Sequence, residues 1–180
     1  ACKNISTLMN YFKKHRFRFD DIISGRVDAQ NPMDRPHTRF DGRNLQEINQ
    51  KWAHAQNDAL GYFLWFYCKL VNEGILRPKI DDIDILLLFP TYWQAIRYWE
   101  DEDSGHWEET RKISASSIGV VIAALKNLKS ISEDHCYLEG PVALLDSLDK
   151  LIKIGQERLD LILPFECIQT TPNQYRRYDS

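Results

Sequence analysis

The sequence predicts an all-α protein of roughly six or seven helices, and three observations lead to this class. Apolar residues recur at helical spacing in several segments, the first of which contains Ile5, Leu8, Met9 and Phe12. Glycine and proline follow several of these segments, where helices end. No segment shows convincing strand alternation, and no Asn-Gly turn indicates a hairpin.

The expected elements follow one another along the chain. The first helix runs over residues 5 to about 17, and a long loop follows over residues 24–44, which hold two glycines and two prolines. Residues 57–71 are apolar on nearly every side, so this helix is expected between neighbouring helices. Gly74 and Pro78 end it.

The later elements are also helical. An apolar run over residues 83–89 is expected to kink or break at Pro90 and to resume through Trp99. Residues 114–128 form the next helix, and Pro141 opens a further one. Helices paired in succession suggest an α/α architecture.

Composition narrows the function classes. The chain has 180 residues, of which 43% are hydrophobic and 27% are charged, so one globular domain is expected. The formal net charge of −3 argues against nucleic acid or an anionic membrane as the main partner. The longest apolar stretch, residues 59–71, is shorter than the roughly 20 residues that a membrane-spanning helix needs.

The four cysteines are widely spaced and show no metal-ligand pattern. We therefore expect no metal site, and a reducing cytoplasm is the default location because nothing in the chain demands disulfides.

Two segments combine tryptophan, carboxylates and amides beside apolar helices. The first is KWAHAQNDALG, residues 51–61, in which Trp52, Gln56 and Asp58 lie at the start of the most buried helix. Gln56 and Asp58 could bind sugar hydroxyls. Alternatively, Asp58 is a carboxylate favoured by the positive N-terminal end of the helix. Spacing alone favours the structural interpretation.

The second segment, DEDSGHWEETRK at residues 101–112, contains a candidate acid. Glycosidic cleavage needs a protonated carboxylic acid beside the leaving oxygen. An indole wall raises the pKa of a neighbouring carboxyl because it disfavours the charged form. Glu108 follows Trp107, so this pair could act as a general acid in a cleft. The carboxylates of residues 100–103 are expected to form a solvated loop.

The order and spacing of four segments resemble one known family. WAHAQNDA at residues 52–59 is similar to a W-x-x-x-Q-x-D segment, and DSGHWE at residues 103–108 to a D-x-G-x-W-E segment. SASSIGVVIAALKNL and LPFECIQTTPNQYRRYDS resemble two further segments. The chain thus resembles the glucoamylase family of glycoside hydrolases, family 15, whose relatives include the glucoamylase-like domain of the phosphorylase kinase α and β subunits.

This resemblance implies a fold and an activity. The fold is an (α/α)6 toroid, or barrel, with its active site at one end of the inner helices. The activity is inverting hydrolysis of α-glucosidic bonds in an α-glucan or small glucoside, with no cofactor. By position, Glu108 matches the general acid. The implied substrate contacts are Trp52, Gln56, Asp58, Trp107, Glu109 and, as a weaker match, Trp99.

The chain departs from the family pattern in two places. The family's N-terminal Trp-x-Arg-Asp segment, which grips the terminal glucose, is not found upstream of Trp52. The catalytic base lies later in the family than anything that matches these residues. We therefore expect residues 1–180 to be a single domain that is a fragment of a larger (α/α)6 domain, and this polypeptide alone to be inactive.

The sequence leaves three functions open. The first is a glucoamylase-like enzyme. The second is a non-catalytic carbohydrate-binding or regulatory module, as in phosphorylase kinase subunits. The third is a helical interaction domain in which Trp52 and Trp107 belong to the core. If Trp52, Asp58 and Glu108 do not line one cleft, the first two functions fail and the third remains. An incomplete toroid would also expose apolar helix faces, which favour self-association.

Overall fold

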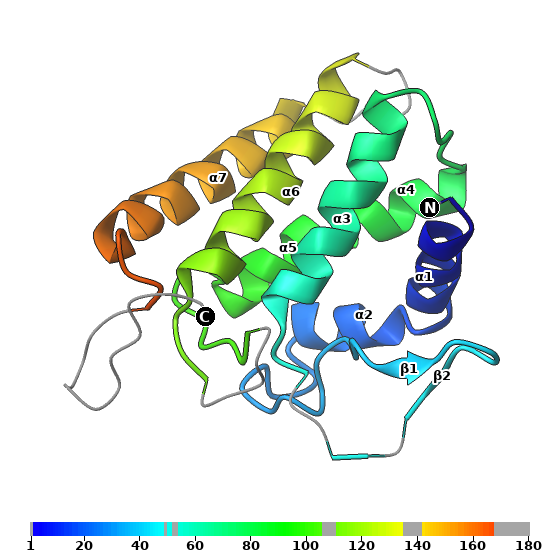
Figure 1. Cartoon of the computed structure of the whole chain (residues 1–180), viewed down its shortest axis with the longest axis horizontal. Helices are drawn as coiled ribbons and strands as arrows, with labels where there is room; N and C mark the ends of the chain where they lie inside the picture. Colours follow the sequence, from blue (N-terminus) through cyan, green and yellow to red (C-terminus); the bar gives the residue numbers. More distant parts are fainter. Residues whose placement is uncertain (1, 49, 52–53, 106–110, 135–141, 168–180) are drawn as a thin grey trace.

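The computed structural model describes residues 2–48, 50–51, 54–105, 111–134 and 142–167, and this part of the chain is mostly helical (Figure 1). Its seven helices are α1 (Cys2–Lys14), α2 (Phe17–Ile23), α3 (Asn57–Asn72), α4 (Ile80–Leu86), α5 (Leu88–Ile96), α6 (Ala115–Asp134) and α7 (Val142–Ile162). The all-α prediction is confirmed. None of the described helices is long and apolar enough to cross a membrane.

Helices α3 and α6 pack side by side at the centre, and α7 lies against α6 (Figure 1). Gly61 on α3 permits the close approach to α6. A Cβ atom at Gly61 would lie 2.8 Å from Cγ1 of Val120 and 3.3 Å from its carbonyl carbon. Because α3 and α6 are so close, the segments that precede them are brought to the same end of the helix pair.

The remaining helices form a second group around α1 and α2. Helix α2 packs against α5, and α1 packs against α4. Aromatic rings fill the space between these elements, with Phe12, Phe19, Phe63 and Phe89 in mutual contact. The helix expected over residues 5–17 is α1, which ends earlier, at Lys14, and the separate helix α2 was not predicted. The chain turns at His15 and Arg16: the His15 N–H still donates to the Tyr11 carbonyl four residues earlier, whereas the Arg16 N–H donates to the Lys13 carbonyl three residues earlier.

The predicted break at Pro90 lies elsewhere. The helix breaks at Leu87, between α4 and α5, and Pro90 is the third residue of α5. Proline is tolerated there because the first turn of a helix does not use its backbone N–H groups. Helix α5 ends at Ile96, since Arg97 adopts a left-handed conformation with φ 54°. Trp99 therefore follows the helix.

The prediction that the chain lacks strands is wrong in one short stretch. Strand β1 (Phe40–Asp41) pairs antiparallel with β2 (Gln46–Glu47). Asp41 starts the turn, where its carboxylate accepts a hydrogen bond from the Arg43 N–H at 2.8 Å. The strands are joined by a four-residue loop, residues 42–45, in which Leu45 is left-handed with φ 56°, so the turn is not the two-residue Asp-Gly type. Tyr11 of α1 holds the hairpin by stacking on Phe40, with ring centroids 3.9 Å apart.

Candidate active site

The structure describes three of the seven predicted site residues. Gln56, Asp58 and Trp99 lie within the described part of the chain. Trp52, Trp107, Glu108 and Glu109 lie outside the described residues, so the geometry of the site is built from the segments that flank them.

Gln56 and Asp58 lie at the N-terminal end of α3, and both side chains are buried. The Gln56 side-chain oxygen accepts a hydrogen bond from the hydroxyl of Thr38, which belongs to the long loop before β1. Asp58 lies in the first turn of α3, where the helix dipole favours a carboxylate. The first predicted segment thus begins a buried helix and is held there by the loop.

The second predicted segment is a loop whose two ends are joined. The Asp103 N–H donates to the Lys112 carbonyl at 2.7 Å, and the Lys112 N–H donates back to the Asp103 carbonyl at 2.8 Å. This antiparallel pair closes the base of residues 104–111. Glu108 lies between Asp103 and Lys112 in the sequence.

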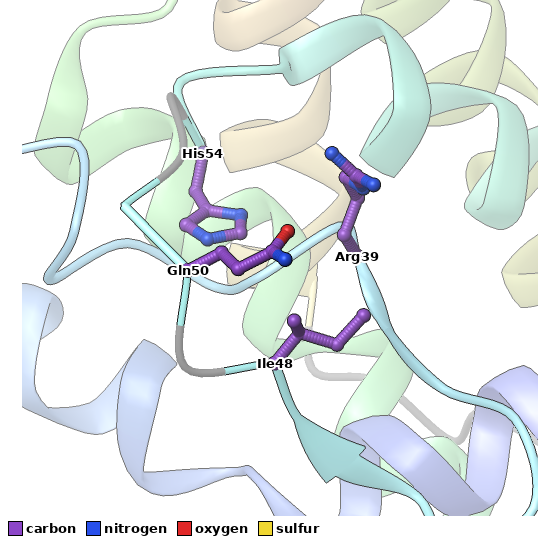
Figure 2. A pocket seen from close by; sticks show the side chains of 4 residues that line it. All are labelled: Arg39, Ile48, Gln50 and His54. Atoms are coloured by element: carbon purple, nitrogen blue, oxygen red, sulfur yellow. The ribbon is translucent and has the colours of Figure 1, made fainter.

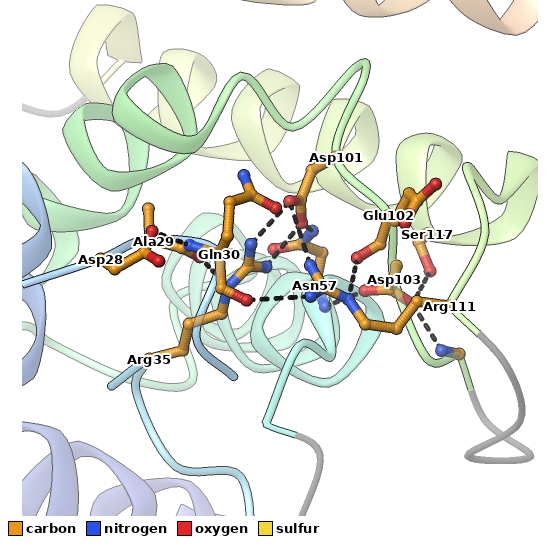
Figure 3. A network of polar contacts seen from close by, with 11 residues as sticks. Asp28, Ala29, Gln30, Arg35, Asn57, Asp101, Glu102, Asp103, Arg111 and Ser117 are labelled. Carbon is orange, nitrogen blue, oxygen red and sulfur yellow. Dashed lines mark hydrogen bonds and ion pairs between the residues drawn. The ribbon is translucent and has the colours of Figure 1, made fainter. Parts of the chain in front are cut away.

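The base of the loop lies directly against the first segment. The Ser104 N–H donates to the Ala55 carbonyl at 2.8 Å, and the Asn57 N–H donates to the Asp103 carboxylate at 2.5 Å. Figure 3 shows this carboxylate among its partners. The structure therefore brings together the segment that follows Trp52 and the residues that precede Trp107.

Asp103 is a buried carboxylate with three hydrogen-bond donors. Besides Asn57, the Ser117 hydroxyl donates to it at 2.8 Å and the Gly105 N–H at 2.6 Å. Burial raises the pKa of Asp103 to about 7, and the nearby charge of Asp58 adds to this rise. The three donors lower the pKa and offset part of the increase.

A second buried acid overturns the prediction that residues 100–103 form a solvated loop. Arg35 donates two hydrogen bonds to Asp101, each 2.6 Å long, and both side chains are fully buried (Figure 3). The Asn57 side-chain amide donates to the same carboxylate at 2.8 Å. Only Glu100 and Glu102 of this run are exposed. The prediction failed because the partner of Asp101 lies 66 residues away in the chain.

Arg111, which precedes Lys112, is also fixed by hydrogen bonds to other segments. Arg111 donates from Nε to the Glu102 carbonyl at 2.8 Å and from Nη1 to the Gln30 carbonyl at 3.0 Å (Figure 3). Its Nη2 lies 3.7 Å from the Asp101 carboxylate. One charged network therefore connects the long N-terminal loop with both ends of the segment that carries Glu108.

Trp99 lies apart from these contacts. Its ring meets Tyr98 edge-on with centroids 5.5 Å apart, and its carbonyl accepts a hydrogen bond from Arg158 of α7 at 3.2 Å. The Arg97 guanidinium lies 6.0 Å from the Trp99 ring centroid. None of these described contacts involves the segment of Gln56 and Asp58.

The chain that follows α7, at residues 163–167, contacts the N-terminal end of α6. The Glu166 carboxylate accepts hydrogen bonds from the Ser114 hydroxyl and, at 2.7 Å, from the Ser116 hydroxyl. The Ala115 N–H donates to the Glu166 carbonyl at 2.7 Å. The Ser-rich start of α6 therefore receives an acidic cap from the chain that follows α7.

A cluster of histidines, which the sequence interpretation missed, lies beneath the hairpin. His37 and His54 stack with ring centroids 3.6 Å apart and an interplanar angle of 8°. His15 and His37 each have Nδ1 within 3.8 Å of a Glu47 carboxylate oxygen. Arg18 binds the same carboxylate through two hydrogen bonds of 2.8 and 2.7 Å. No described set of His, Cys, Asp and Glu residues has an arrangement that could hold a metal ion.

Burial favours the neutral form of two of these imidazoles, His37 and His54. It lowers the pKa of His54 to about 4, and the neighbouring His37 charge adds to the decrease. Burial also lowers the pKa of His37. The Thr38 N–H donates to Nδ1 of His54 at 3.3 Å, which assigns the His54 proton to Nε2. His54 lines a small pocket with Arg39, Ile48 and Gln50, and Figure 2 shows these four side chains.

In this mostly helical fold, the buried acids Asp101 and Asp103 thus contact Asn57 at the start of α3. The model of the family described as glycosyl hydrolases family 15 matches residues 25–134, which is more than half of the chain. The chain belongs to this family, and the resemblance drawn from its motifs is confirmed. Neither a curated protein nor a solved structure matches it.

Proposed function

We propose that this chain supplies the general-acid half of an inverting glycoside hydrolase site that acts on α-glucosidic bonds. Glu108 is the acid, and Trp52, Gln56, Asp58, Trp99, Trp107 and Glu109 contact the substrate. Family membership supports the reaction class. The observation that carries the proposal is the hydrogen bond from the Ser104 N–H to the Ala55 carbonyl, because it joins the two segments on which all of these residues except Trp99 lie.

The chemistry requires the acid to hold its proton until the bond breaks. Glu108 donates the proton to the glycosidic oxygen as the bond to the anomeric carbon cleaves, and a water molecule attacks that carbon from the opposite face. An inverting enzyme places the base that activates this water roughly 6.5–9.5 Å from the acid. Trp107 precedes Glu108 in the sequence, and an indole placed against the carboxyl would favour the protonated acid at neutral pH.

The test is glucose release from maltose by the whole protein that contains these residues. Glu108→Gln removes the proton donor at nearly constant volume, so we expect kcat to fall by about 10²–10⁴. Glu102→Gln is the matched control, because Glu102 is an exposed glutamate of the same loop region. Retention of full activity by Glu108→Gln would contradict the proposal.

The 180-residue polypeptide gives a second test. We expect it to bind maltooligosaccharides, as measured by calorimetry, but not to release glucose from them. If the whole protein also binds without cleavage, the site is that of a carbohydrate-binding module and the enzymatic proposal is wrong. If neither form binds and neither releases glucose, both carbohydrate functions are excluded and the third function, a helical interaction domain, is supported.

A further inference from the structure

We propose that Asp103 is the positioning residue for the general acid, and that its carboxylate and backbone together set the place of the loop that carries Glu108. This inference rests on the proposed function, because it requires Glu108 to donate a proton. Asp103 is 3% exposed, so it acts through the loop and does not touch substrate.

The carboxylate of Asp103 joins three parts of the fold. One oxygen accepts the Asn57 N–H at the start of α3 at 2.5 Å. The other accepts the Ser117 hydroxyl from the first turn of α6 at 2.8 Å and the Gly105 N–H at 2.6 Å. The Gly105 backbone is left-handed with φ 60°, a conformation that suits glycine. One side chain therefore fixes the start of the loop relative to both central helices.

The backbone of Asp103 fixes the other end of the loop. Its N–H and carbonyl form the two hydrogen bonds with Lys112 that close residues 104–111. Arg111 adds bonds to the Glu102 and Gln30 carbonyls at 2.8 and 3.0 Å. Movement of Asp103 would therefore shift both ends of the segment that contains Glu108.

Above its pKa of about 7 the Asp103 side chain is a carboxylate, which matches its three partners because each of them is a hydrogen-bond donor. Asparagine has nearly the same volume, but it has one acceptor oxygen and an amide that is itself a donor. In an Asp103→Asn variant, the amide group would face a donor, either the Asn57 N–H or the Ser117 and Gly105 pair. The substitution thus changes the hydrogen bonds of the loop base while it leaves the packing volume nearly unchanged.

A misplaced acid affects some substrates more than others. A misplacement of about 1 Å near the chemistry can lower the rate by about 10². The loss depends on how much proton donation the leaving group requires. The glucose unit that leaves maltose needs a proton on the glycosidic oxygen. In α-glucosyl fluoride, the C–F bond breaks and fluoride leaves with its electron pair, while water supplies the new C–O bond, so little acid assistance is needed.

The experiment compares these two substrates in the whole protein. For Asp103→Asn we expect kcat on maltose to fall by roughly 10–100-fold with little change in KM, and kcat on α-glucosyl fluoride to fall by less than about threefold. Asp84→Asn, a change at an exposed aspartate of α4, is the matched control and should alter neither rate. Ser117→Ala removes one donor and keeps the carboxylate, so it should show the same substrate pattern with a smaller loss.

The outcomes separate this inference from the proposed function. If Asp103→Asn reduces both substrates equally, or neither, Asp103 does not position the acid. If Glu108→Gln leaves maltose hydrolysis intact, the proposed function itself fails. If Asp103→Asn does not fold, as judged by circular dichroism, the substrate pattern of Ser117→Ala decides: selective loss on maltose supports the inference, and equal or absent loss overturns it.

Discussion

Two buried polar centres flank the segment that leads into α3, and they are built on opposite principles. The carboxylate centre consists of Arg35, Asn57, Asp101, Asp103 and Ser117. The histidine centre consists of His15, Arg18, His37, Glu47 and His54. In the first, each buried acid has two or more donors. In the second, one nitrogen of each ring has no hydrogen-bond partner among the described residues.

This difference determines how each centre responds to protons. The carboxylate centre holds an acid, Asp103, whose pKa is raised to about 7, so folding shifts this group toward its neutral form relative to the unfolded state. The histidine centre holds bases whose pKa values are lowered, so the folded state also favours the neutral form. Since neutral carboxyls dominate in acid and neutral imidazoles in base, the two centres have opposite pH dependence.

The largest expected effect comes from the buried ion pair. Arg35→Met leaves the Asp101 carboxylate buried without its guanidinium, and such a loss costs about 3–5 kcal/mol. Urea unfolding at neutral pH measures this change. Arg97→Met is the matched control, because Arg97 pairs with Glu100 on the surface and its side chain is 63% exposed. That variant should lose less than about 1 kcal/mol. A similar small loss for Arg35→Met would mean that the carboxylate centre does not depend on this pair.

The next effect concerns the pH dependence of the carboxylate centre. Asp103 has an ordinary pKa of 3.8 and a folded value of about 7, so between these pH values the folded state holds a proton that the unfolded state has released. Its contribution to stability therefore falls by up to about 4 kcal/mol as the pH rises from 4 to 8. Asp103→Asn lacks this titration. Denaturant unfolding at several pH values across this range gives the free energy of unfolding of the wild type and of the variant. The value for the wild type minus that for the variant should fall steadily as the pH rises. A constant difference would contradict the raised pKa.

The helices could be predicted from the sequence, whereas their ends could not. The apolar spacing of residues 57–71 and 114–128 is visible in the chain, and α3 and α6 cover these residues. The end of α4 at Leu87 depends on how α4 and α5 pack, so Pro90 marked it only approximately. The hairpin has no two-residue turn signal, because its loop has four residues and its left-handed position is taken by Leu45 and not by glycine.

The two polar centres lay beyond prediction because their members are far apart in sequence. Arg35 and Asp101 are separated by 66 residues, and either charge taken alone is typical of a solvated loop. His37 and His54 carry no recognisable spacing, and only the fold brings their rings together. By contrast, the D-x-G-x-W-E pattern marked Asp103 through the family resemblance, although nothing in the pattern indicated its three donors.

The histidine centre should show the opposite pH dependence. His54 has an ordinary pKa of 6.5 and a folded value of about 4, so between these values the unfolded state binds a proton that the folded state does not. Stability is therefore lost as the pH falls from 6.5 to 4, by about 3 kcal/mol for this group. His54→Asn keeps an acceptor near the position of Nδ1 but does not titrate. Unfolding curves of this variant should decline less in acid than those of the wild type, and equal declines would assign the effect to other groups.

The smallest effect concerns Thr38, which connects the histidine centre to the start of α3. Thr38 donates its N–H to His54 and its hydroxyl to Gln56, so it joins the histidine centre to the start of α3. Thr38→Val removes only the hydroxyl bond, and we expect a loss of about 1 kcal/mol in unfolding free energy. Thr91→Val is the matched control, because the Thr91 hydroxyl bonds the carbonyl of Leu87, the residue that caps its own helix, at an exposed site. The change in unfolding free energy of this variant should stay below about 0.5 kcal/mol.

If Gln56 contacts sugar, Thr38→Val should also weaken maltooligosaccharide binding several-fold in calorimetry while Thr91→Val does not. Equal binding by both variants would mean that Thr38 supports the fold and not the sugar contact.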